Sequence, residues 1–189
     1  MGLSALDACL RWVEAGADWI HLVDLDAAFG RGSNTALLAQ VIANLARLHP
    51  GVSVQWSGGV SSADDVERAL AAGAKRVNLG AGALKDLAAT TALVGRFGRH
   101  LNVCLDVSAA SAAPSADLAA YVVHPRGQGG PVGPLEPILA ALNEAGTGAY
   151  VVTDRVRDGA LSGPNLPLLG ALSGATSAQV IASGGVSCA

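Results

Sequence analysis

Residues 56–63, Trp-Ser-Gly-Gly-Val-Ser-Ser-Ala, return at the end of the chain, where 182–189 read Ala-Ser-Gly-Gly-Val-Ser-Cys-Ala. In both copies a short apolar run precedes the Ser-Gly-Gly triplet. Self-similarity at a long period is typical of an architecture built by duplication. We therefore predict two related half-structures, each with an apolar strand that leads into a Ser-Gly-Gly turn.

A second matching pair lies upstream of each turn. An apolar run ends at Asp24 and is followed by Gly32-Ser33-Asn34, and another ends at Asp154 and is followed by Gly163-Pro164-Asn165. The repeat therefore covers more than the glycines. Two backbone-rich turns related by pseudo-symmetry suit a ligand that carries a phosphate at each end.

Composition narrows the class of protein. The 189 residues are 51% apolar and 14% charged, which favours one hydrophobic core and a single domain over residues 1–189. A net charge of −3 argues against nucleic acid as a partner. The three cysteines are widely spaced, which indicates no metal site and a reduced cytoplasmic setting. No apolar run reaches the roughly 18 residues of a membrane span.

Short apolar runs alternate with helical patterns along the chain, which predicts an α/β fold with a parallel sheet. Eight such units close a (β/α)8 barrel of about 250 residues, with its active site at the carboxyl ends of the strands. We count six strands, so we predict a TIM-type barrel of half-barrel origin whose first and last strands are absent from this chain. A long loop over 108–133 holds one extended piece, 121–124. The predicted strands are 19–25, 52–56, 76–79, 101–107, 149–153 and 179–182.

The turns Ser57-Gly58-Gly59 and Ser183-Gly184-Gly185 each follow a predicted strand directly. Glycine lets the backbone approach an anion, and successive N–H groups bind phosphate oxygens. The alternative is that Gly-Gly only turns the strand into a helix. Two copies in matched contexts favour phosphate binding. Gly80-Ala81, after the next strand, is predicted to share the phosphate of the first turn, or else to be a tight barrel turn.

Five aspartates lie at or just after predicted strand ends: Asp24, Asp26, Asp106, Asp154 and Asp158. Carboxylates there converge on the barrel mouth, where two of them can act as general acid and general base. Many such aspartates instead cap the next helix. Asp106 and Asp158 are the stronger candidates, since no helical pattern follows them at once. We assign Asp24 and Asp26 to structure and expect no chemistry from the four histidines.

Two longer stretches carry a family resemblance. Residues 19–34, WIHLVDLDAAFGRGSN, and 150–165, YVVTDRVRDGALSGPN, resemble the phosphoribosyl isomerases of histidine biosynthesis, and the resemblance spans essentially the whole chain. Ser57 before Gly58-Gly59, together with Ala-Ala-Phe-Gly-Arg at 27–31, resembles the bifunctional form. That form also isomerises phosphoribosylanthranilate in tryptophan biosynthesis.

The resemblance implies an Amadori rearrangement of the aminoaldose ProFAR to the aminoketose PRFAR, without cofactor or metal, on a substrate with two phosphates. It implies Asp158 as the general acid, supported by Asp106 and Thr153. Gly159 and Arg126 would contact substrate beside the glycine turns. The general base would be an aspartate on a first strand, which these residues do not contain. We therefore expect little turnover from the isolated chain, and self-association through open strand edges in place of a monomer.

Three positions depart from the family pattern. Ser61 stands where an arginine contacts substrate, Ala81 where a hydroxyl helps to bind phosphate, and Gln128, after Arg126-Gly127, where a tryptophan stacks on substrate. Each lost polar contact would cost on the order of 1–3 kcal/mol. Two alternatives therefore stay open: a non-catalytic remnant that still binds sugar phosphates, and a cyclase-like relative that pairs with a glutaminase.

Overall fold

The computed structural model describes residues 4–109, 115–125 and 130–186. Strands and helices alternate along the described chain, and its principal strand pairs are parallel, which confirms the predicted α/β class. The chain divides into two compact units, Met1–Asn78 and Leu79–Ala189, which are described one at a time. That both belong to one domain stays a prediction.

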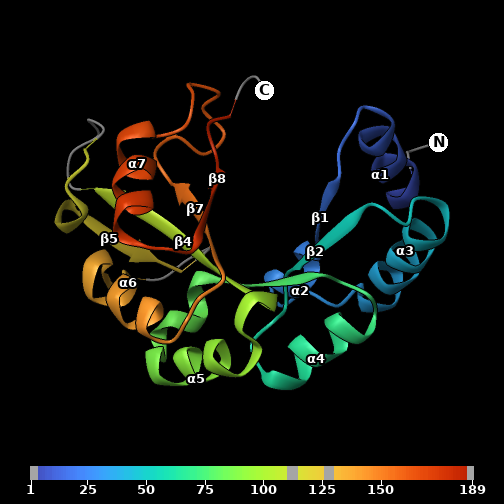
Figure 1. The fold of residues 1–189 in the computed structure, drawn as a ribbon, viewed down its shortest axis with the longest axis horizontal. Coiled ribbons are helices and arrows are strands. Elements are labelled where there is room, and N and C mark those ends of the chain that lie inside the picture. The colour runs from blue at the N-terminus through green and yellow to red at the C-terminus, as the bar shows by residue number, and fades with distance from the viewer. Residues whose placement is uncertain (1–3, 110–114, 126–129, 187–189) are drawn as a thin grey trace. The chain divides into compact units, whose positions relative to one another are not determined.

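The first unit is built on three parallel strands. β1 pairs with β2 from Trp19↔Ser53 to Val23↔Ser57, and β2 pairs with β3 up to Ser57↔Asn78. In Figure 1 α1 and α3 lie on one side of β1 and β2. The elements are α1 (Ala5–Glu14), β1 (Trp19–Val23), α2 (Leu25–Ala28), α3 (Thr35–Leu48), β2 (Ser53–Ser57), α4 (Ala63–Ala71) and β3 (Arg76–Leu79).

The periodic pattern of buried and exposed side chains defines the core of the first unit. Ile20 on β1 is buried, whereas its neighbour Trp19 is exposed, as expected of a strand with one covered face. On α3 the buried residues Leu38, Ile42 and Leu45 recur at helical spacing and supply the facing apolar stripe. β1 ends two residues earlier than predicted. The chain leaves the strand at Asp24, because Asp24 is the N-cap of α2.

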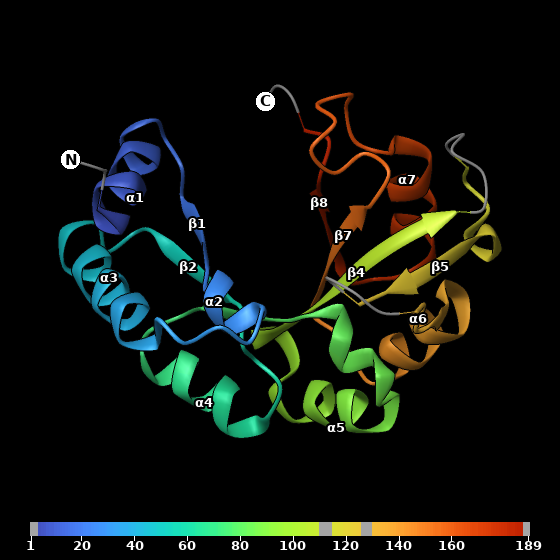
Figure 2. The same cartoon turned by 180° about the vertical axis from the view of Figure 1, so that it is seen from behind.

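The second unit is a mixed sheet of five strands. β7 lies between β4 and β8 and is parallel to both, whereas β5 is antiparallel to β4 and β6 to β5. Figure 2 shows β4, β7 and β8 with α7, which contacts β8. The elements are η1 (Ala81–Lys85), α5 (Leu87–Phe97), η2 (Gly98–His100), β4 (Leu101–Ala109), η3 (Leu118–Ala120), β5 (Tyr121–His124), β6 (Gly133–Pro134), α6 (Leu135–Glu144), β7 (Ala149–Asp154), α7 (Leu166–Ala175) and β8 (Gln179–Ser183).

The extended piece predicted inside the long loop is β5, and it is part of the sheet. β4 runs two residues beyond its predicted end, to Ala109, and forms an antiparallel ladder from Asp106↔His124 to Ala109↔Tyr121. Ser108 and Ala109 are weak strand formers, so the sequence pattern stops short of them. Pairing with β5 is what extends the strand.

The repeat in the sequence corresponds to a repeated hydrogen bond. Asn34 Nδ2 donates to Asp24 Oδ1 at 3.0 Å, and Asn165 Nδ2 donates to Asp154 Oδ2 at 2.7 Å. Asn34 occupies the N-cap position of α3, but its side chain makes no capping bond there. Its amide instead closes the loop after β1.

We expect Asn165→Ala to destabilise the fold by about 1–3 kcal/mol, because it removes the amide that donates to the half-buried Asp154 carboxylate and to the hydroxyl of buried Tyr121. Asn44→Ala is the matched control, since the half-buried Asn44 side chain bonds only within its own helix, to the Gln40 carbonyl and the Arg47 guanidinium. Urea unfolding of the three proteins measures the difference. Equal stability of both variants would contradict the assigned role of Asn165.

Candidate functional site

Four polar side chains form a row across the second unit. The ladders align Asp106 with Thr153, Thr153 with Ser183 and, on the other side of β4, Asp106 with His124. Directly paired residues point to the same face of a sheet, and neighbouring strands lie about 4.8 Å apart. Asp106 and Thr153 are buried, at 5% and 3% exposure. The row therefore runs from β8 through β7 and β4 to β5.

Asp158 joins this row from the loop after β7. Its N–H donates to the Asp154 carbonyl at 3.0 Å. A Cβ placed on Gly184 would lie 3.3 Å from Asp158 Oδ1 and 3.2 Å from the methyl group of Thr153. Three of the residues predicted for the site, Asp158, Thr153 and Gly184, thus converge on one point at the carboxyl ends of β7 and β8.

The loop that carries Asp158 closes onto the second glycine turn. Gly163 N–H donates to the Gly185 carbonyl at 2.8 Å, and Arg157 Nη1 donates to the Gly163 carbonyl at 2.9 Å. Gly185 has a φ of +76°, and a Cβ there would lie 2.6 Å from the Gly163 oxygen. Glycine is therefore required at this position by the packing of the loop.

The first glycine turn packs in the same manner against the loop after β1. Gly58 has a φ of +95°, and a Cβ there would collide with the backbone carbonyl of Asp24. Burial raises the pKa of the Asp24 carboxyl, but bonds from the N–H groups of Ala27 and Asn34 outweigh it, so the pKa lies below its usual value. Asp24 is held as an anion that organises the loop, which confirms the structural role predicted for it.

The packing of the turns leaves their amides available. Among the described residues, no acceptor receives a hydrogen bond from the N–H groups of Gly58, Gly59 or Val60, and the same holds for Gly184 and Gly185. Successive unpaired amides of this kind attract oxyanions. Glycine is thus required here for packing, while the amides that it exposes match the predicted phosphate chemistry.

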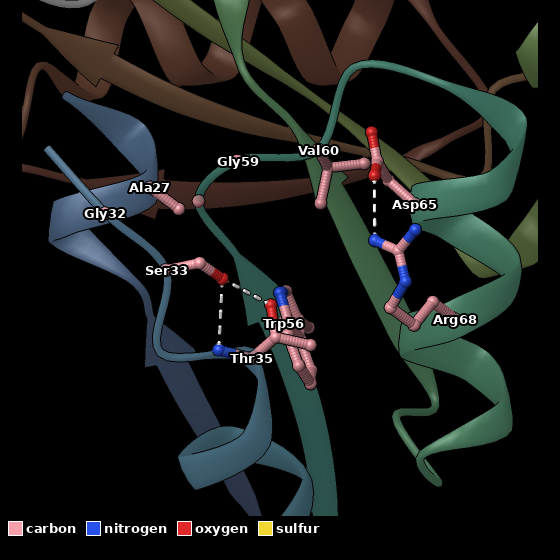
Figure 3. Close-up of a pocket in the computed structure, with 10 residues that line it drawn as sticks. Ala27, Gly32, Ser33, Thr35, Trp56, Gly59, Val60, Asp65 and Arg68 are labelled. Carbon is pink, nitrogen blue, oxygen red and sulfur yellow. Dashed lines mark hydrogen bonds and ion pairs between the residues drawn. The ribbon is translucent and has the colours of Figure 1, made fainter. Parts of the chain in front are cut away.

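A cavity of about 300 Å³ opens beside the first turn. It is lined by the hydroxyl groups of Ser33 and Thr35, the backbone of Gly58 to Val60, the Trp56 ring, and Asp65 and Arg68 of α4. Figure 3 shows the Asp65–Arg68 pair on one side and the Ser33–Thr35 pair on the other. Most of these groups are hydrogen-bond donors.

The one carboxylate among these lining groups is already occupied. Asp65 accepts bonds from the backbone and hydroxyl groups of Ser61 and Ser62 and forms a 2.9 Å ion pair with Arg68. Burial raises its pKa, but these donors outweigh it and lower the pKa to about 2. Asp65 therefore caps α4 as a fixed anion and repels an incoming anion less than a free carboxylate would.

The remaining predicted residues are distributed between the units. Gly80 is the N-cap of η1, and Ala81 is buried at 1% exposure, both in the second unit, whereas Ser57-Gly58-Gly59 lies in the first. A phosphate shared by these turns stays a prediction. Gly159 follows Asp158 directly with a φ of +75°. Arg126, with Gly127 and Gln128, lies outside the described residues.

His124 is the residue that sequence analysis missed. The sequence places it at the end of the extended piece 121–124 and indicates no chemistry for it, whereas the structure aligns it with Asp106 across β5 and β4. The alternation of buried Tyr121 and Val123 with half-buried Val122 and His124 is a strand signal. Which residue of β4 it faces depends on the antiparallel register, and no local pattern encodes that register.

The described residues contain no group of three or more His, Cys, Asp or Glu side chains that would hold a metal ion. Within the same residues, no helix is long and apolar enough to cross a membrane.

Comparison with known proteins decides the family. Residues 3–189 match the histidine biosynthesis protein family. The chain belongs to this family. It is 47% identical over 184 residues to a 1-(5-phosphoribosyl)-5-((5-phosphoribosylamino)methylideneamino)imidazole-4-carboxamide isomerase of Nocardia farcinica, covering 97% of this chain and 71% of that protein. Phosphoribosyl isomerase A of Mycobacterium avium is also 47% identical, with the same coverage. The Mycobacterium ulcerans protein of that name is 46% identical, covering 97% and 70%.

Membership confirms the resemblance read from residues 19–34 and 150–165, and with it the predicted fold class. The relatives are named as isomerases, so the predicted enzyme class is confirmed at the level of the family. Six parallel strands are present among the described residues, fewer than the eight of a (β/α)8 barrel.

We expect the cap of α4 to make stability depend on acid pH. A carboxyl whose folded pKa is lowered stabilises the fold above its unfolded pKa, here 3.8, and that contribution is lost as pH falls toward about 2. Thermal unfolding between pH 5 and pH 2 measures this. Asp65→Asn should lose stability at pH 5 and approach the wild type at pH 2. Its neighbour Asp64, exposed on the same turn, supplies the control Asp64→Asn, which should follow the wild-type curve.

Proposed function

We propose that this protein is an aldose–ketose isomerase of histidine biosynthesis that converts the ProFAR aminoaldose to the PRFAR aminoketose. The observation that carries the proposal is the convergence of Asp158, Thr153 and Gly184 beside Asp106. An acid, a hydroxyl and an exposed backbone turn at one sheet edge suit the opening of a sugar ring next to a phosphate.

In the proposed mechanism Asp158 acts as the general acid. It protonates the ribose ring oxygen, the C1–O bond breaks, and the amino nitrogen forms a Schiff base with C1. A general base then removes the C2 proton, the electron pair moves toward the nitrogen, and protonation at C1 with loss of the C2 hydroxyl proton gives the aminoketose. Electrons only shift within the substrate, so the reaction needs no redox cofactor. Thr153 and Asp106, paired on adjacent strands, position the reacting sugar.

Binding of the two phosphates is assigned to the two glycine turns. Unpaired amides at Gly58, Gly59, Gly184 and Gly185 support the proposal, because they supply donors where basic side chains are sparse. The cavity beside the first turn adds the Arg68 guanidinium, whose one hydrogen bond to a described residue goes to Asp65.

We also infer a cytoplasmic location, supported by the widely spaced cysteines.

The assay of this proposal is conversion of the aminoaldose, with Asp158→Asn as the test variant. The resemblance places the general base on a strand outside these 189 residues, so the chain is compared with one extended by family-like first and last strands. We expect turnover in the extended protein and a loss of about 10²–10⁴-fold in Asp158→Asn. Asp64→Asn, which changes an exposed aspartate on α4, is the control. Full turnover in Asp158→Asn would refute the assigned acid.

A second substrate is favoured by the Ala-Ala-Phe-Gly-Arg segment at 27–31 and by relatives named phosphoribosyl isomerase A. We propose that the same site also isomerises phosphoribosylanthranilate. We expect the extended protein to convert both substrates and Asp158→Asn to lose both activities together, because one acid serves both ring openings. Turnover of the aminoaldose alone would limit the protein to histidine biosynthesis.

A further inference from the structure

His124 is fixed in place at the β5 end of the row of Ser183, Thr153, Asp106 and His124. Its Nε2 lies 2.8 Å from the hydroxyl oxygen of Ser108, which follows Asp106 by two residues on the same face of β4. The ring is half-buried and stands opposite Asp106 in the ladder. Its second nitrogen, Nδ1, makes no hydrogen bond to any residue that the structure describes.

The surroundings of the ring favour its neutral form. Burial lowers the pKa of His124, the Arg155 guanidinium beyond β7 lowers it further, and the Asp106 carboxylate on β4 raises it in part. The net pKa lies below the ordinary 6.5. At neutral pH the neutral form of the imidazole is therefore favoured. In the neutral ring the two nitrogens take opposite roles, so Nδ1 donates where Nε2 accepts from Ser108, and accepts where Nε2 donates to it.

We infer that His124 is a substrate-binding residue of this site, making a hydrogen bond through Nδ1 to a neutral polar group of the substrate. This inference rests on the proposed function. A neutral ring beside a carboxylate attracts a hydroxyl or carboxamide group and not a phosphate. Three strand spacings of about 4.8 Å separate His124 from Ser183 at the other end of the row. Asp158 and the second glycine turn hold the reacting end, and His124 holds the far part of the ligand.

The test measures binding, so it does not depend on turnover. Affinity for the aminoketose product is measured by calorimetry on the 189-residue chain and on His124→Phe, which keeps a ring but has no ring nitrogen, with His49→Phe as the control. His49 is the C-cap of α3 and belongs to the first unit, whereas the row belongs to the second. We expect about tenfold weaker binding in His124→Phe, the loss of one well-placed hydrogen bond, and unchanged binding in His49→Phe. Ser108→Ala should fall between them, because the ring loses its fixed orientation.

A second measurement covers the case in which the His124 variant does not fold. The four histidines are followed by their ring proton resonances in the wild-type chain, with and without the product. The His124 signals should shift at saturation.

The outcomes separate the two claims. Product that binds the wild type and His124→Phe equally, or that leaves the His124 resonances unmoved at saturation, overturns the inference and leaves the proposed isomerase intact. A wild-type chain that does not bind the product at all refutes the proposed function, and the inference fails with it. Weaker binding in His49→Phe as well as in His124→Phe would show a general loss of structure and also count against a specific contact.

Discussion

The hydrogen bond between Asn165 and Asp154, 2.7 Å long, holds the loop on which the candidate site depends. The two residues are eleven positions apart, and the segment between them carries Asp158. The same amide reaches the buried hydroxyl of Tyr121, so the loop is fixed to the start of β5 as well. An acid on a loop is precisely placed only if the loop has one conformation, and the two bonds from the Asn165 amide restrict it to one.

The first unit contains the corresponding hydrogen bond but lacks the candidate acid. Asp24 and Asn34 form the corresponding bond, and the loop again rests on a glycine turn. Four residues after Asp24 the chain has Ala28, whereas four residues after Asp154 it has Asp158. Both copies of the repeat therefore keep the Asp–Asn hydrogen bond that closes the loop, whereas the acid is present in one copy. The copy without it keeps a donor-rich cavity beside its turn.

The glycine turns serve two purposes, close packing against a neighbouring loop and exposure of backbone amides. At Gly185 a side chain would strike the Gly163 carbonyl, so the residue is needed for packing. The amide that this packing leaves unpaired is also the group that suits a phosphate. Replacing such a glycine therefore tests packing and binding together, which is why the acid Asp158 and the ring of His124 are the more discriminating targets.

The sequence by itself determined the alternation of strands and helices, the duplication, the family and the identity of Asp158 as the candidate acid. These follow from local periodicity and from motifs that are contiguous in the chain. Only the tertiary structure decided that Asp106 and His124 face each other, because antiparallel register between β4 and β5 joins segments that no local pattern relates. It also decided that Asn34 closes a loop and does not cap α3, since its partner carboxylate lies ten residues away.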